Sequence, residues 1–302
     1  MHPTNQMSPQ SPIIVLDSGL GGLTVVRALR AELPGEDILY FGDTARLPYG
    51  SKTASTVTAF VRQIISYLRP FDPKHVVIAC NTATALALPA VRASFPDLPI
   101  SGVVEPGAKA AVAAAGAKPI PIIGIMATEA TIRSRAYEKA IHRRRHHARM
   151  VLQPAPLLVP IIEEGRTNKD PLVRLAVKQY LSGLMQHKVD VLVLGCTHYP
   201  ILRELIAEIV GSEMKVIDSA EQCAQDVAHR LRARGLARQQ HEPADQLPAP
   251  NFLRTFVTDD PPRFKRLATR FLGLGIDLPT WVSPDELYQQ QPSHPVPVSI
   301  PA

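Results

Sequence analysis

The chain has 302 residues, of which 45% are hydrophobic and 20% charged, so it is long enough for two domains and has the composition of an ordinary globular protein. No stretch approaches the ~18 uncharged apolar residues of a membrane span, and the first ten residues lack the basic and apolar regions of a secretory signal. Three widely spaced cysteines argue against a disulfide framework, and they predict reduced thiols in a cytoplasmic protein.

The 33 basic residues exceed the 27 acidic ones and give a net charge of +6. Much of the excess lies in "HRRRHHAR", residues 142–149, a run typical of a solvated helix end. No aromatic stacking motif or nucleic-acid-binding module accompanies this run, so we expect no nucleic-acid partner. We expect the positive charge to suit an anionic small molecule instead.

In the first third of the chain, short apolar runs alternate with helical segments. The runs predict strands at 13–17, 37–43, 75–80 and 100–106, and the segments between them predict helices at 22–32, 53–68 and near 85–94. Fully apolar strands that alternate with helices indicate a parallel sheet covered on both faces.

The same pattern then restarts. It predicts strands at 120–128, 148–153, 189–196 and 215–219, with helices at 131–141, 169–187 and 200–210. Leu16 maps onto Ile125 and Cys80 onto Cys196 with similar offsets, which suggests duplication. We therefore predict an α/β fold of two pseudo-symmetric lobes with largely parallel sheets and an active site in the cleft between them.

A helix at 220–234 and a strand and helix within 251–273 are expected to return to the first lobe. The Pro-rich end of the chain and its first residues are predicted to be poorly ordered tails. The prediction divides the chain into an N-terminal tail, a first lobe of two segments, a second lobe and a C-terminal tail: residues 1–11, 12–104 with 219–275, 105–218 and 276–302.

Two cysteines occupy the same kind of position. In "VIACNTAT" (77–84) and "LVLGCTHYP" (192–200), a strand is followed by Cys80 or Cys196, then by polar residues and a helix. Ligands of parallel α/β proteins bind beyond the carboxyl ends of the strands, where a helix N-terminus can also stabilise a thiolate. Two facing lobes would direct both thiols at one ligand.

Other interpretations use the same residues. Zinc binding by Cys80, Cys196 and His198 is conceivable, but no CxxC or HxxxH spacing supports it. A Cys-His hydrolase would use Cys196 and His198 and would leave Cys80 without a role. Cys223 is predicted to lie in the core, because apolar residues follow it at spacings of four.

The stretch "VLDSGLGGLTV" (15–25) has glycines after a strand, but Thr24 replaces the third glycine of a dinucleotide-binding fingerprint. We expect the N–H groups of this turn to hold a carboxylate. Asp17 would then hold a substrate ammonium group or assist a thiol, while helix capping is the alternative for Asp17 and Ser18. Glu163 lies at the end of an apolar helical turn, where it is either functional or part of a solvated acidic helix end.

The motifs "DSGLGG", "YFGDTARLPYG", "ACNTAT", "GVVEP", "VPIIEEG" and "LGCTHYP", in this order, resemble those of the glutamate racemases, in the cofactor-independent amino-acid racemase superfamily. The resemblance runs from about residue 13 to about residue 273. The chain departs from the family pattern at Ala155 and at "TDDP" (258–261), neither of which is a catalytic position.

The resemblance implies interconversion of L- and D-glutamate by two thiols, without cofactor or metal, to supply D-glutamate for peptidoglycan. It implies that Cys80 acts on the D-enantiomer and Cys196 on the L-enantiomer, with Asp17, His198 and Glu163 as helpers. The family's substrate-binding positions fall on Asp17, Ser18, Tyr49, Gly50, Asn81, Thr82, Thr197 and His198. A racemase for aspartate or another amino acid stays open, as do a non-catalytic two-lobed binding protein and a homodimer.

Overall fold

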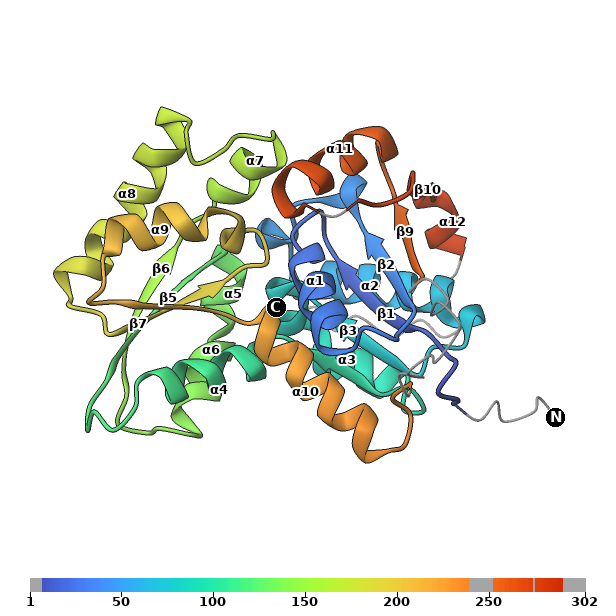
Figure 1. Cartoon of the computed structure of the whole chain (residues 1–302), viewed down its shortest axis with the longest axis horizontal. Coiled ribbons are helices and arrows are strands. Elements are labelled where there is room, and N and C mark those ends of the chain that lie inside the picture. The colour runs from blue at the N-terminus through green and yellow to red at the C-terminus, as the bar shows by residue number, and fades with distance from the viewer. Residues whose placement is uncertain (1–6, 239–251, 274, 290–302) are drawn as a thin grey trace, which may run out of the picture.

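Within residues 7–238, 252–273 and 275–289, which the computed structural model describes, the strands form two separate parallel sheets, one of six strands and one of four. Each sheet is the centre of one α/β lobe, and the two lobes lie side by side (Figure 1). No helix in these ranges is long and apolar enough to cross a membrane. The predicted fold of two α/β lobes with parallel sheets is confirmed.

The first lobe is built on the six-stranded sheet, whose strand order is β10-β9-β2-β1-β3-β4. These strands are β1 (Ile13–Asp17), β2 (Ile38–Gly42), β3 (His75–Ile78), β4 (Ile100–Gly102), β9 (Leu253–Val257) and β10 (Thr280–Trp281). One face is covered by α1 (Leu23–Glu32), α10 (Ala220–Ala233) and α11 (Pro261–Leu272). The other face is covered by α2 (Ala54–Leu68), α3 (Asn81–Ser94) and α12 (Pro284–Gln289).

The second lobe is built on the four-stranded sheet, whose strand order is β6-β5-β7-β8. These strands are β5 (Ile122–Ala127), β6 (Arg149–Pro154), β7 (Val191–Gly195) and β8 (Lys215–Asp218). One face packs against α4 (Val104–Ala114) and α6 (Ala136–His142), with α5 (Glu129–Ser134) beside them. The other face packs against α7 (Leu158–Glu163), α8 (Pro171–Gln186) and α9 (Arg203–Val210).

The two sheets share one topology, because the order β2-β1-β3-β4 in the first sheet matches the order β6-β5-β7-β8 in the second. Two residues before each cysteine, Ile78 pairs with Leu16 and Leu194 pairs with Met126. The position equivalent to Leu16 is therefore Met126, one residue after the Ile125 expected from sequence. Both cysteines follow the carboxyl end of a third strand, as the predicted duplication requires.

Three elements differ from the sequence expectation. The predicted strand 100–106 ends at Gly102, where a Cβ would lie 2.4 Å from Thr84 Cγ2, and an alanine-rich run of high helix propensity then forms α4. The predicted helix 131–141 is divided at Arg135, whose φ of 56° lies in the left-handed region. Helix α3 begins directly after Cys80 rather than near residue 85.

The predicted C-terminal tail is wrong for its first part. β10 pairs with β9 in the sheet, and Val282 and Leu287 are fully buried in the core under α2. Burial of these two apolar side chains stabilises the packing of this segment on the first lobe. At the other end, the carbonyl oxygen of Pro9 accepts a hydrogen bond from Lys74 Nζ at 2.7 Å. The rest of both predicted tails, 1–6 and 290–302, lies outside the described residues.

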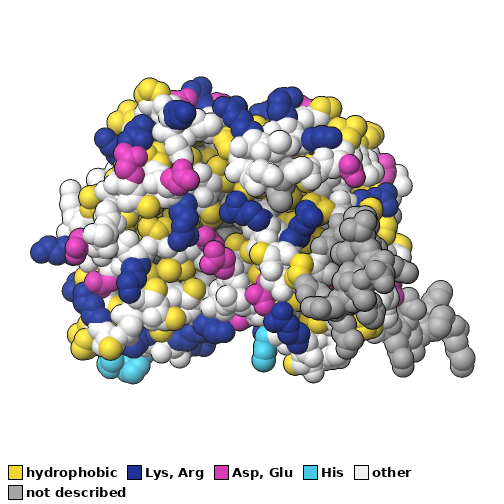
Figure 2. Space-filling view, in the orientation of Figure 1, with side chains coloured by type: hydrophobic (Ala, Val, Ile, Leu, Met, Phe, Trp, Pro, Cys, Tyr) yellow, Lys and Arg dark blue, Asp and Glu magenta, His cyan; other side chains and the backbone are white. Residues whose placement is uncertain are grey.

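The basic run 142–149 makes contacts within the second lobe. Arg143 and Arg144 both pair with Glu105 of α4, and Arg145 donates to the carbonyl oxygen of Lys118. Figure 2 shows that on the face in view Lys and Arg side chains are spread over both lobes among acidic ones. Part of the run therefore holds the end of α6 against its neighbours.

Replacing Leu287 with alanine should lower the free energy of unfolding by about 2–5 kcal/mol, the usual cost of truncating a buried leucine. Urea unfolding measures this change. The matched control is Leu278→Ala, since Leu278 is 62% exposed and its truncation should cost less than about 0.5 kcal/mol. Equal stability of the two variants would contradict the packing of residues 276–289 on the first lobe.

Candidate active site

The two cysteines lie at the carboxyl edges of the two sheets and are both 6% exposed. Cys80 precedes α3, and its Sγ accepts a hydrogen bond from Ala83 N at 3.5 Å. Cys196 follows β7 and precedes a short 3-10 helix, Tyr199–Leu202. Consecutive residues at the end of β1 contact both cysteine loops, since Ser18 lies beside Cys80 and Asp17 accepts from Thr197, so the two cysteines lie at one site. The structure thus brings together the two predicted thiols from different lobes.

The end of β1 reaches both thiols. The Cys80 thiol lies 3.8 Å from Ser18 Oγ, to which it donates. Asp17 Oδ2 accepts a hydrogen bond from Thr197 Oγ1 of the other lobe at 3.1 Å, and Asp17 Oδ1 accepts one from Gly19 N at 3.0 Å. Helix α1 has Gly22 at its N-cap without a side-chain cap, so Asp17 and Ser18 do not cap this helix.

Burial raises the pKa of the Cys80 thiol to about 12, and the negative charge of Asp17 adds to this shift. Burial also raises the pKa of Asp17, although the charge of His198 and the hydrogen bonds from Gly19 and Thr197 oppose it. Cys80 is therefore a neutral thiol near neutral pH, the form that can donate a proton. A cationic group bound beside Asp17 would lower both pKa values.

His198 links Cys196 to Glu163. Its Nδ1 lies 3.9 Å from Cys196 Sγ, and its Nε2 lies 2.5 Å from Glu163 Oε1. Burial alone would lower the pKa of His198, but the hydrogen bonds with Cys196 and Glu163 outweigh burial and raise this pKa well above its ordinary value. Burial opposes ionisation of Glu163, yet the same hydrogen bond keeps its pKa below the ordinary value. The two residues form an imidazolium–carboxylate pair in which His198 is buried and Glu163 is partly buried.

The glycine turn after β1 does hold a carboxylate, but it is one of the protein's own. Leu20 N donates to Glu163 Oε1 at 2.9 Å, which joins the two lobes. A Cβ on Gly21 would lie 2.5 Å from Thr197 Oγ1 and 2.6 Å from His198 Nδ1. The turn therefore requires glycine, because side chains of the second lobe approach its backbone closely.

The polar residues after Cys80 contact the second lobe as well. Asn81 Oδ1 accepts a hydrogen bond from Tyr137 at 2.6 Å, while its Nδ2 is buried and has no partner among the described residues. Thr82 Oγ1 lies 2.8 Å from Thr128 Oγ1 and 3.2 Å from Thr131 Oγ1. Thr128, Thr131 and Tyr137 were not among the site residues predicted from the sequence.

Tyr49 and Gly50 lie on a 3-10 turn, Tyr49–Ser51, between the lobes. The Tyr49 side chain is 1% exposed in the first-lobe core, and its hydroxyl donates to Asp43. A Cβ on Gly50 would lie 2.7 Å from Thr128 Cβ. The backbone of Gly50, rather than the side chain of Tyr49, therefore lies against the cluster of Thr82, Thr128 and Thr131 hydroxyl groups.

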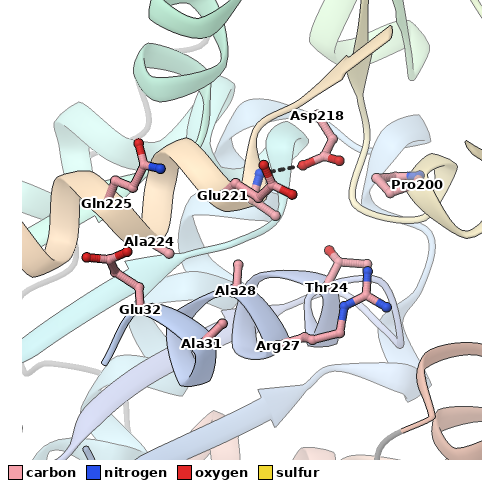
Figure 3. Close-up of a pocket in the computed structure, with 11 residues that line it drawn as sticks. Thr24, Arg27, Ala28, Ala31, Glu32, Pro200, Asp218, Glu221, Ala224 and Gln225 are labelled. Atoms are coloured by element: carbon pink, nitrogen blue, oxygen red, sulfur yellow. Dashed lines mark hydrogen bonds between the residues drawn. The ribbon is translucent and has the colours of Figure 1, made fainter. Parts of the chain in front are cut away.

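A surface groove lies between α1 and α10, apart from these residues (Figure 3). Its lining includes charged side chains such as Arg27, Glu32 and Glu221. None of the predicted site residues lines it, so the groove is separate from the thiol site.

Comparison with known proteins shows which family the chain resembles over most of its length. Residues 23–227 match the family described as Asp/Glu/Hydantoin racemase. A glutamate racemase of Geobacter metallireducens is 45% identical over 88% of this chain and 94% of its own length. A glutamate racemase isoform of Bacillus anthracis has a TM-score of 0.80 at 36% identity, covering 90% of this chain and 99% of its own. A Francisella tularensis glutamate racemase in complex with D-glutamate also has a TM-score of 0.80, at 35% identity over 91% and 98% of the two chains.

The stability difference between the wild-type protein and Glu163→Gln should depend on pH. Because the pKa of His198 is raised, its stabilising effect is full below its ordinary value of 6.5 and is lost as pH rises through the raised pKa. Because the pKa of Glu163 is lowered, its effect is full above 4.5 and is lost as pH falls through the lowered pKa. Urea titrations should therefore give the largest difference between pH 4.5 and 6.5.

The matched control is Glu164→Gln, since the Glu164 side chain is 61% exposed and pairs only with Arg166 in the described part of the chain. Its stability difference should be small and nearly independent of pH over that range. A Glu163→Gln difference that is constant from about pH 5 to about pH 9 would contradict the imidazolium–carboxylate pair.

Proposed function

Because the chain belongs to the Asp/Glu/Hydantoin racemase family, we propose that it interconverts L-glutamate and D-glutamate. The observation that carries this proposal is the pair of buried thiols, one from each lobe, at the ends of equivalent strands. The names of its relatives, and the D-glutamate bound in the Francisella tularensis structure, support glutamate as the substrate.

Inversion of a carbon atom requires a base on one face and an acid on the other, and two thiols can exchange these roles when the reaction reverses. In the L-to-D direction, the Cys196 thiolate removes the α-proton, and the electron pair of the broken C–H bond stays on the substrate. The Cys80 thiol gives its proton to the opposite face, which forms the new C–H bond and leaves a thiolate. The reverse reaction uses Cys80 as base and Cys196 as acid.

The helpers follow from the contacts of each thiol. The high pKa of Cys80, about 12, supports its role as the proton donor in the L-to-D direction. His198 lies 3.9 Å from Cys196, so its imidazolium exchanges protons with that sulfur, and Glu163 holds the imidazolium in place. Asp17, a buried carboxylate between the thiols, receives the substrate ammonium group.

Neutral donors are suited to the two substrate carboxylates. The Asn81 amide is supported in this role by its buried Nδ2, and Ser18 Oγ, which accepts from the Cys80 thiol, keeps its own hydrogen to donate. Thr82 and Thr197 would exchange hydrogen bonds that they make within the protein for bonds to the substrate. The α-proton is very weakly acidic, so donors fixed beside the α-carboxylate stabilise the carbanion-like transition state. In this scheme neither a metal nor an organic cofactor takes part.

The same proposal gives the reaction a place in the cell. The D-glutamate formed would supply peptidoglycan synthesis, and the three free thiols suit the reducing conditions of a cytoplasm.

Cys80→Ala and Cys196→Ala should each lower kcat/KM for racemisation by at least about a thousandfold, because each removes the acid or base of one face. Circular dichroism of the glutamate solution measures the conversion in both directions. Cys223→Ala is the matched control, since Cys223 is a fully buried thiol of α10 in the first-lobe core. A variant without Cys80 or Cys196 that keeps near wild-type activity would refute the two-thiol mechanism.

In D₂O, L-glutamate converted early in the reaction should yield D-glutamate with deuterium at Cα, while unreacted L-glutamate stays largely protiated. The reason is that the incoming hydron comes from Cys80, which has equilibrated with solvent, whereas the proton removed stays on Cys196 and can return. Mass spectrometry of the separated enantiomers at low conversion gives both isotope contents. Substantial protium in the D-glutamate would instead indicate a single base that serves both faces.

A further inference from the structure

Tyr137 connects the loops that carry the two cysteines. It lies on α6 of the second lobe, is 2% exposed, and donates its hydroxyl hydrogen to Asn81 Oδ1 of the first lobe at 2.6 Å. A Cβ on Gly195 would lie 3.2 Å from Tyr137 Cε2. One side chain therefore contacts both the residue that follows Cys80 and the residue that precedes Cys196.

This hydrogen bond decides which way the Asn81 amide faces. Burial raises the pKa of the Tyr137 hydroxyl, although a hydrogen bond with Ser219 opposes this shift, so the hydroxyl keeps its hydrogen and donates it to Asn81 Oδ1. With Oδ1 occupied, Nδ2 is turned away from Tyr137, and it is buried without a partner among the described residues. A buried N–H donor in that state suits a negatively charged acceptor such as a carboxylate.

We propose that Tyr137 is a positioning residue, which fixes the Asn81 amide so that Nδ2 donates to a carboxylate of the substrate. The inference rests on the proposed function, since it takes a dicarboxylic amino acid as the substrate. Without the tyrosine hydroxyl, the amide can rotate and present Oδ1, an acceptor that repels the carboxylate.

The surroundings of Tyr137 allow a sharp test. A Cβ on Gly107 would lie 2.9 Å from the Tyr137 hydroxyl oxygen, so the hydroxyl sits in close packing against α4. Tyr137→Phe removes only this oxygen and keeps the ring against Gly195. A change in activity then reports the hydrogen bond, provided that packing effects are separated from it.

We expect Tyr137→Phe to raise KM for both enantiomers of glutamate about tenfold, with kcat changed less than about threefold, because the lost contact is made to substrate and transition state alike. The separation from packing comes from a double-mutant cycle with Asn81→Ala. In the Asn81→Ala background, adding Tyr137→Phe should change KM by less than about twofold, because the group through which the tyrosine acts is gone.

A second variant tests the amide's direction directly. In Asn81→Asp, Tyr137 keeps an acceptor, but an oxygen replaces Nδ2 and should raise KM by about a hundredfold through repulsion of the substrate carboxylate. This variant keeps the proposal testable if Tyr137→Phe does not fold, which thermal unfolding of each variant would reveal. An unchanged KM in Asn81→Asp would overturn the proposal.

Two further results would also overturn the proposal. The first is an unchanged KM in Tyr137→Phe when the wild-type protein is active. The second is an effect of Tyr137→Phe on KM that is equally large with Asn81 and in the Asn81→Ala variant, which would make the tyrosine a packing residue. A wild-type protein that leaves L-glutamate optically unchanged would refute the proposed function itself, and this inference with it.

Discussion

A carboxylate buried as deeply as Asp17 must find hydrogen-bond donors, and the second lobe provides one of them through Thr197. The next residues continue the same connection, because Ser18 lies beside the Cys80 thiol and Leu20 N binds Glu163 of the second lobe. The hydrogen bond from Thr197 to Asp17 thus forms only when the two lobes are in contact. Closure of the lobes and assembly of the thiol site are for this reason one event.

The lobes share a topology but not a charge distribution. By strand register, the equivalent of Asp17 is Ala127, and two residues after the cysteines Thr82 corresponds to His198. Each thiol therefore has a different ionisable neighbour: an acidic one from β1 near Cys80 and an imidazolium beside Cys196. A duplicated scaffold with unequal neighbours can hold one sulfur as an acid while the other serves as a base, which a symmetric site could not do.

The sequence predicted the parallel lobes and the matched cysteines because both depend on local patterns: short apolar strands, and the residues that follow them. Contacts between the lobes could not be predicted in the same way, because they join residues far apart in the sequence. The offset that mapped Leu16 onto Ile125 also maps Ser18 onto Ala127, whereas the observed register maps it onto Thr128, which lies in the hydroxyl cluster. With the observed register, Thr128 would have been identified as the counterpart of Ser18. Tyr137 carries no sequence signal of its own, and the packing of residues 276–289 depends on partners far away in the chain.

Cys80 and Cys196 are each only 6% exposed, and this burial affects both their oxidation and their access to a ligand. Peroxide and electrophiles attack thiolates that they can reach, so burial protects these sulfurs from sulfenic and sulfonic acid formation. The same burial separates the sulfurs from any ligand in solvent, so access to them depends on contacts between the lobes such as Thr197 with Asp17 and Leu20 with Glu163. Under the proposed function, opening of these contacts would therefore be part of each catalytic cycle.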